Sequence, residues 1–153
     1  MKARMTPLAV AVSLFAATAY AADPNLGSWK LDEARSKIPA GTGKNTSVVY
    51  EPAGDSMKCT VEGVDKEGKP VHNEWTGKTD GKDYPVTGDA TVDTRSLKKV
   101  DEHHNTVVNK KAGKVTVTGN VVFAKDFKTR TLTLSGKDKD GKPITGTWVY
   151  NRQ

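Results

Sequence analysis

Turn-forming residues recur about every dozen residues along the chain, and this spacing constrains the fold more than any other feature. Tight hairpins require the Gly, Asp and Asn residues found at these points, as in Gly88-Asp89. Because the connections are short, each strand must pair with its sequence neighbour, which predicts an antiparallel meander. Between the turns, alternating β-rich stretches predict strands at 27–32, 46–51, 56–63, 70–77, 83–87, 91–99, 105–110, 114–124, 129–136 and 143–150.

Almost nothing in the sequence favours helix. The segment 33–37 has the composition for one helical turn before Pro39, and Gly41 and Gly43 prevent a longer one. We therefore expect an all-β fold with eight to ten strands.

A meander of this size is expected to close on itself, since closure removes the exposed edges of the sheet. A sandwich is the alternative, but it requires two fully apolar inner faces. Here the hydrophobic content is only 35%, and the strands carry many threonines. A small barrel tolerates a partly polar interior or holds a ligand, so the composition favours an up-and-down barrel.

One hairpin pattern occurs twice. Residues 60–75 and 133–148 both run from a strand through an Asp-Lys-acid-Gly-Lys turn and a proline to a tryptophan. Gene duplication and shared hairpin physics both explain the echo, and the second is favoured because the rest of the two halves does not match. Either way, Trp75 and Trp148 are expected at equivalent depths.

The first 21 residues have the pattern of a cleavable export signal. A basic start is followed by an uncharged apolar run from Leu8 to Ala19, and Ala19-Tyr20-Ala21 is a small-x-small cleavage pattern. A transmembrane anchor is the alternative, but the run is shorter than the roughly 20 residues needed to span a bilayer. We expect cleavage after Ala21, a single domain over 22–153, and a periplasmic or secreted protein without a stable membrane anchor.

The charge of the chain does not favour nucleic-acid binding. Removing Lys2 and Arg4 with the signal lowers the net charge from +6 to +4, and the lysines are dispersed through turns. A nucleic-acid binder would gather them on one face with aromatic residues. The single cysteine, Cys59, excludes an internal disulfide. It shares a face with Met57 and Val61, so we expect a small buried hydrophobic residue.

Both ends of the predicted barrel carry aromatic motifs. The first strand begins with Gly27-Ser28-Trp29-Lys30-Leu31, and the chain closes with Thr147-Trp148-Val149-Tyr150-Asn151-Arg152. These ends resemble calycin barrels, the lipocalins and fatty-acid-binding proteins, and the whole plan is similar to small bacterial exported proteins of this lipocalin-like kind.

The resemblance implies roles for a few residues. Gly27 and Trp29 would close one barrel end, with Trp29 packed under Arg152, a cation–π contact of about 1 kcal/mol. Fatty-acid-binding proteins hold a carboxylate with an Arg-x-Tyr pair, whereas this chain has Tyr150-x-Arg152, the reverse order. The connection after Leu31 is too short for their helical lid, so the open-mouthed lipocalin-like form fits better.

No motif in the chain indicates catalysis, a cofactor or a metal. His103-His104 beside Asp101 and Glu102 offers metal-ligand types, but the segment reads as a turn and neighbouring strand residues face opposite ways. The turn at 138–141 lacks the spacing of a calcium loop. A nucleophile would need a neighbouring base, and the lone candidate His72 is expected on the surface.

Two inward faces predict a cavity wall. Val115, Val117, Val121 and Phe123 share one face of a long strand, and Trp148 shares a face of the last strand with Ile144, Tyr150 and Arg152. We expect these faces to hold a small apolar or amphipathic ligand, with its polar head toward Tyr150 and Arg152. The predicted ligand-binding residues are Trp75, Val117, Phe123, Trp148, Tyr150 and Arg152.

Three functions are compatible with these features. The first is a monomeric, non-enzymatic binding protein for a small molecule. The second is a protein-interaction module, for example of protease-inhibitor type, acting through its rim loops. The third is an enzyme that uses the cavity. A filled core is the structural alternative to a hollow barrel.

Overall fold

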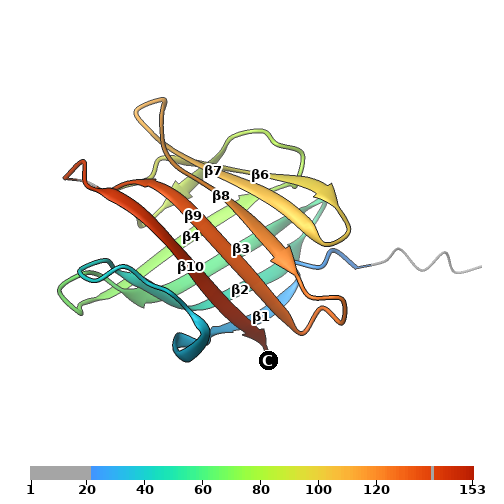
Figure 1. Cartoon of the computed structure of the whole chain (residues 1–153). Coiled ribbons are helices and arrows are strands. Elements are labelled where there is room, and N and C mark those ends of the chain that lie inside the picture. Colours follow the sequence, from blue (N-terminus) through green and yellow to red (C-terminus); the bar gives the residue numbers. More distant parts are fainter. Residues whose placement is uncertain (1–21, 139) are drawn as a thin grey trace, which may run out of the picture.

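Ten antiparallel strands wind into a closed barrel in the computed structural model, which describes residues 22–138 and 140–153 (Figure 1). Each strand pairs with its sequence neighbours, and β1 pairs with β10 to close the sheet. The predicted all-β meander closed into a barrel is therefore confirmed, whereas the predicted signal, residues 1–21, lies outside the described residues. The strands are β1 (Gly27–Leu31), β2 (Lys44–Ala53), β3 (Ser56–Val64), β4 (Pro70–Gly77), β5 (Tyr84–Thr87), β6 (Thr94–Asp101), β7 (His104–Lys111), β8 (Lys114–Phe123), β9 (Thr129–Lys137) and β10 (Pro143–Arg152).

Within the described residues the helical content is one short 3-10 turn, η1 (Glu33–Arg35), which is shorter than the predicted segment. Asp32 caps it by accepting a hydrogen bond from the backbone N–H of Arg35. In the described part of the chain, no helix has the length and apolar character to cross a membrane.

The start of β6 differs from its prediction by three residues. The predicted strand begins at residue 91, but β6 begins at Thr94. The Asp89 carboxylate accepts a hydrogen bond from the backbone N–H of Thr91, and the N–H of Val92 donates to the carbonyl of Asp89. This local turn uses the polar groups that would otherwise extend the strand.

The echoed hairpins have the same turn. Asp65 and Asp138 each accept side-chain hydrogen bonds from the backbone N–H groups two and four residues later. A glycine follows in each turn, Gly68 with φ +80° and Gly141 with φ +78°. Shared hairpin physics accounts for this match because every element of it is local.

Two β-bulges interrupt the strand pairing at the end of the barrel that carries these turns. The β2–β3 register skips Thr46, and the β7–β8 register skips Thr116. Gly136 of β9 lies against the second bulge, where an added Cβ would be 2.2 Å from the carbonyl oxygen of Thr116. The same bulge turns Val115 outward, with 56% of its surface exposed, so its predicted inward position is wrong.

The seam between the first and last strands is short. β1 pairs with β10 over Trp29–Leu31 only, and Figure 1 shows the C-terminus at this seam. Beyond this seam, residues 32–39, here called the covering segment, lie along the edge of β10. Asp32 N–H donates to the carbonyl of Val149 over 2.8 Å, and Lys37 and Thr147 exchange two backbone hydrogen bonds.

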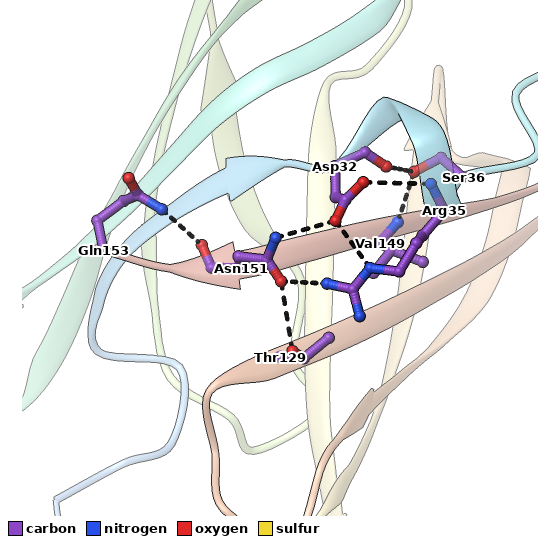
Figure 2. Close-up of polar contacts among 7 residues, drawn as sticks. All are labelled: Asp32, Arg35, Ser36, Thr129, Val149, Asn151 and Gln153. Atoms are coloured by element: carbon purple, nitrogen blue, oxygen red, sulfur yellow. Dashed lines mark hydrogen bonds and ion pairs between the residues drawn. The ribbon is translucent and has the colours of Figure 1, made fainter.

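Side chains also hold this covering segment in place (Figure 2). The Asp32 carboxylate accepts hydrogen bonds from the Arg35 guanidinium at 2.7 Å and from the Asn151 amide at 3.0 Å. Ser36 accepts from the N–H of Val149 at 2.9 Å and donates to the carbonyl of Asp32. The Arg35 and Asn151 bonds lower the pKa of Asp32.

Most of the barrel interior is filled. Trp29 is completely buried, and Cys59 is buried among the core side chains as expected. Side chains from every strand contribute to one hydrophobic cluster. Pockets of about 170 and 260 Å³ open at the two ends of the barrel.

Candidate ligand site

A pocket of about 170 Å³ opens at the barrel end that carries the β3–β4, β7–β8 and β9–β10 turns, here called the open end. Its walls come from β8, β9 and β10, from the start of β2 and from the chain that leads into β2. The lining residues are Thr42, Gly43, Asn45, Val117, Leu132, Leu134, Ile144, Trp148 and Tyr150.

Strand alternation produces the apolar wall of this pocket. Leu132 and Leu134 project from the same face of β9, and Trp148 is paired with Leu132 across the β9–β10 ladder. Gly146 lies between the inward residues of β10. An added Cβ there would be 2.7 Å from Cδ of Pro39, so the glycine lets the covering segment approach the pocket rim.

Tyr150 forms the inner boundary of the pocket. Its hydroxyl donates a hydrogen bond to the carbonyl oxygen of Asn45 over 3.0 Å. Burial raises the pKa of Tyr150 to about 12, so the phenol is neutral at physiological pH. The pocket floor is thus an aromatic ring with a hydroxyl already bonded to the protein.

Arg130 comes two residues before Leu132 on β9, so both side chains face the barrel interior. Arg130 pairs with Tyr150 across the β9–β10 ladder. Its guanidinium carbon is 5.1 Å from the centre of the Tyr150 ring. The corresponding distances to Tyr50 and Trp29 are 5.3 and 4.8 Å. Three aromatic rings from three strands therefore surround one cation behind the pocket.

Arg130 is the only buried charged side chain among the described residues, with 5% of its surface exposed. Its Nε has no hydrogen-bond partner, and nowhere in residues 22–138 and 140–153 does an ion pair neutralise the guanidinium. No Asp or Glu side chain is buried in that part of the chain either. The barrel therefore encloses a positive charge without a protein counter-ion.

A phenol and a thiol lie near this cation. Burial raises the pKa of both Tyr50 and Cys59, and the positive charges of Arg130 and Arg95 oppose the shift. Both groups are therefore neutral at physiological pH and leave the charge of Arg130 uncompensated. The Nε of Arg95 is itself occupied, since it donates to Asn109 over 2.9 Å.

The opposite end of the barrel is closed by Arg152 and Trp29. The Arg152 guanidinium carbon lies 4.3 Å from the centre of the Trp29 ring, which is the pairing that the resemblance implies. Arg152 also donates hydrogen bonds to the backbone carbonyls of Pro24, Leu26 and Phe127.

Gly27 makes room for this arrangement. Its φ is +114°, and an added Cβ would be 2.8 Å from Nη1 of Arg152. The indole N–H of Trp29 donates to the carbonyl of Asn25 over 2.8 Å. Gly27 and Trp29 thus lie at the closed end, where the sequence places them.

The six predicted ligand residues separate into two groups. Val117, Trp148 and Tyr150 line the pocket. Trp75 and Phe123 are buried in the filled core, 1% and 2% exposed, and lie outside the pocket lining.

Arg152 also lies outside the pocket lining, because its guanidinium is bonded to carbonyls at the other end of the barrel. The interior cation beside the pocket is Arg130, which the sequence analysis missed together with Leu132 and Leu134. The signal was present: these three residues alternate along the predicted strand 129–136 and must share a face.

The three histidines contact carboxylates, an aromatic ring and an amide. His72 is exposed and contacts Glu62 and Glu74, and these carboxylates raise its pKa. His103 stacks on Phe127 with ring centres 4.5 Å apart. Within the described ranges, no group of three or more His, Cys, Asp or Glu side chains is placed to hold a metal ion.

No protein-family model matches the sequence, and no curated protein matches it. Similar solved structures include EF1p2_mFAP2b bound to DFHBI, which is 13% identical with a TM-score of 0.50 over 87% of this chain and 97% of that chain. Another is a redesigned β-barrel, mFAP1, bound to DFHBI, which is 12% identical with a TM-score of 0.43 over 84% and 95% of the two chains. At these identities the likeness concerns the fold alone.

Proposed function

We propose that this protein is a small-molecule binding protein that holds an apolar or amphipathic ligand at the open end of a lipocalin-like barrel. The observation that carries the proposal is the pocket bounded by Leu132, Leu134, Trp148 and Tyr150. Concave apolar sites with a few polar groups are the usual form of ligand pockets. The mFAP2b barrel, which has a similar fold, is bound to a small molecule in its solved structure.

The size of the pocket limits the ligand. Drug-sized ligands occupy sites of roughly 300–1,000 Å³, whereas this pocket measures about 170 Å³. The ligand is therefore small, or it reaches out through the open end. Since no constellation of nucleophile and base accompanies the pocket in the described residues, the proposal is binding without catalysis.

The proposed place of action is the periplasm or the exterior of the cell. This part rests on the export-signal pattern of residues 1–21, as the sequence analysis describes it. The rim-binding alternative has less support, since the exposed large hydrophobic residues in the described chain are three valines, Val100, Val115 and Val122.

Fluorescence titration tests the proposal. Trp148 lines the pocket, so binding of an apolar probe or a short fatty acid should quench or shift its emission. Val117→Phe places a larger side chain in the pocket, where it competes with the ligand for space. It should weaken binding about tenfold, which corresponds to a loss of about 1.4 kcal/mol of binding free energy.

Val122→Phe is the matched control, because Val122 is on the same strand but 49% exposed. It should leave the affinity unchanged. If a folded wild-type protein binds no probe, or if both variants bind as well as the wild type, the pocket is not a ligand site.

A further inference from the structure

We propose that the outer surface of β6–β10 is a docking surface for an acidic polysaccharide, a chain of sugar units that carry both hydroxyl and carboxylate groups. The inference goes beyond the proposed function, because the pocket lies inside the barrel and this surface lies outside it. Three features of the surface support it: its charge, its hydroxyl groups and its lack of exposed aromatic side chains.

The charge of the chain divides between the two sides of the barrel. Residues 22–93, which form β1–β5, include 9 basic and 13 acidic residues, a net charge of −4. Residues 94–153, which form β6–β10, include 13 basic and 5 acidic residues, a net charge of +8. Because β6–β10 are neighbours in the closed sheet, lysines that are dispersed in the sequence gather on one side (Figure 1, yellow to red). A field of one sign over one side attracts partners of the opposite charge.

Most lysines on this side carry an uncompensated charge. Lys110 and Lys111 pair with Asp83 and Asp93 at 2.6 and 2.7 Å. Six other lysines are exposed and form no ion pair within residues 22–138 and 140–153. These six, here called the lysine rim, stand on β6 and at the ends of β8, β9 and β10: Lys98, Lys114, Lys125, Lys128, Lys137 and Lys142.

The surface between these lysines is uncharged and rich in hydroxyl groups. Its centre, here called the hydroxyl face, consists of outward residues of β8, β9 and β10: Thr118, Asn120, Thr131, Thr133, Ser135 and Thr145. They form rows across the sheet, because Ser135 pairs with both Thr118 and Thr145, and Thr133 pairs with Asn120. Side chains opposite each other in such rows lie about 5 Å apart. The outward positions within 118–122, 129–135 and 145–151 hold no charged residue.

Several of these hydroxyl groups are not engaged by the protein. In the part of the chain that the structure describes, the hydroxyls of Thr131, Thr133, Ser135 and Thr145 have no hydrogen-bond partner. A hydroxyl both donates and accepts hydrogen bonds, so it matches the hydroxyl groups of a sugar as well as a carboxylate. The hydroxyl face thus offers a row of free donors and acceptors to a polar, uncharged part of a ligand.

The lysine rim is spaced for an extended ligand. Lys137 comes nine residues after Lys128, at the other end of β9, which is about 30 Å along a strand. Lys98 pairs with Thr106, and Thr106 pairs with Asn120, so Lys98 continues a row of the hydroxyl face. A small anion contacts one of these lysines at a time, whereas a chain with repeated negative charges contacts several at once. A polymer therefore fits the surface better than a small anion.

The side chains of this surface also distinguish among polyanions. Sites for single-stranded nucleic acids stack bases on aromatic rings, and helices that bind membrane surfaces insert large apolar side chains. Protein interfaces are enriched in aromatic residues, Met and Arg and depleted in Lys and Ser. In the described chain, the exposed large hydrophobic side chains are three valines. An acidic polysaccharide needs the lysines and hydroxyls that are present.

Binding of labelled oligosaccharides tests the inference. Every sugar of a fluorescent oligogalacturonate carries hydroxyls and a carboxylate, so it should bind in low salt and lose affinity as salt screens the lysines. A dextran oligomer of the same length has no charge and should bind at least about tenfold more weakly. Equal binding of the two would overturn the inference. Tighter binding of an oligo-dT strand or of phosphatidylglycerol vesicles at the same ionic strength would also overturn it, in favour of a nucleic acid or a membrane.

Two variants with the same change in net charge locate the surface. Lys128→Gln/Lys137→Gln removes two lysines of the rim and should weaken oligogalacturonate binding about fivefold. Lys30→Gln/Lys82→Gln removes two exposed lysines of the β1–β5 side, which also form no ion pair in the described residues, and should change the affinity less than about twofold. Equal losses in both variants would show attraction by net charge alone and refute a docking surface.

A substitution without a change in charge tests the hydroxyl face. Thr133→Val removes one free hydroxyl and should weaken oligogalacturonate binding about threefold, the effect of one hydrogen bond. Thr76→Val is the matched control, because Thr76 is an exposed threonine on β4, and it should leave the affinity unchanged. If Thr133→Val binds as well as the control, the hydroxyls do not contribute and the polysaccharide assignment is wrong.

Lysine acetylation of the wild type covers the case in which a variant does not fold. Bound oligogalacturonate should protect Lys98, Lys128 and Lys137 from acetylation, whereas Lys30 and Lys82 should react as in the free protein, as read by mass spectrometry. Equal protection of all five, or of none, would place the ligand elsewhere and overturn the inference. The pocket lies on the inner face of the sheet, so that outcome leaves the proposed function intact.

Discussion

Replacing Arg130 and Arg152 in turn by methionine should change stability in opposite directions. Both guanidinium carbons lie close to the Trp29 ring, at 4.8 and 4.3 Å from its centre. The substitution is the same and the neighbouring ring is the same. Arg130 is buried without a hydrogen-bond partner, whereas Arg152 donates to three backbone carbonyls, so the comparison contrasts an unpaired with a paired guanidinium.

For Arg130 the desolvation penalty exceeds the attraction from the rings. Burying an unpaired ion costs several kcal/mol after relaxation, and three ring contacts at about 1 kcal/mol each return about 3 kcal/mol. Methionine is apolar, flexible and well suited to aromatic neighbours. We expect Arg130→Met to raise the free energy of unfolding of the ligand-free protein by about 1–2 kcal/mol.

For Arg152 the sign is reversed. Methionine would leave the carbonyls of Pro24, Leu26 and Phe127 without their donor. At about 1 kcal/mol for each lost bond, Arg152→Met should lower the free energy of unfolding by about 3 kcal/mol.

Urea unfolding followed by far-ultraviolet circular dichroism measures both changes, provided that the slope of the transition is unchanged. Unfolding and refolding should first remove any co-purified ligand, because a bound ligand stabilises the wild type by mass action. If Arg130→Met is destabilised as much as Arg152→Met, Arg130 is a structural residue and the reasoning is wrong.

Two further predictions concern Tyr150 and Gly136. Burial raises the pKa of Tyr150 to about 12 from its ordinary value near 10, so the unfolded state releases this proton first as the pH rises. The stability present below about pH 10 should therefore fall between about pH 10 and 12, and less so in Tyr150→Phe, as followed by urea unfolding. Gly136→Ala places a Cβ 2.2 Å from the Thr116 carbonyl and should cost about 1–3 kcal/mol, whereas Ser135→Ala on the outward face should cost little; equal thermal midpoints would contradict this.

The barrel could be predicted from the sequence because its determinants are local. Turn residues and alternation are visible in any window of ten residues, and ten of the expected strands match the ten observed. The position of Val115 could not be obtained this way. It depends on the bulge at Thr116, which forms between β8 and its neighbour and reverses the side-chain alternation.

The candidate site was predicted in part. Val117, Trp148 and Tyr150 follow from alternation, whereas the depth to which the barrel is filled depends on packing among strands distant in sequence. The sequence analysis placed Arg152 at the ligand, and this error could not be detected from the sequence. Its true partners are backbone carbonyls of distant segments, which have no side-chain signature. No sequence motif distinguishes Arg130, although its spacing of two residues from Leu132 already predicts that both face the same side of the strand.

The three-residue seam between β1 and β10 determines when this chain can finish folding. Trp29 and Arg152 are paired neighbours in the sheet but stand at opposite ends of the folded sequence. Closing so long a loop is entropically costly, and proteins dominated by such distant contacts fold slowly. Hairpins from β2 to β9 can form early, but Arg152 can cover Trp29 at the closed end only after the last strand has paired. A nascent chain thus carries an unfinished barrel with two open edges until the residues of β10 are free to pair.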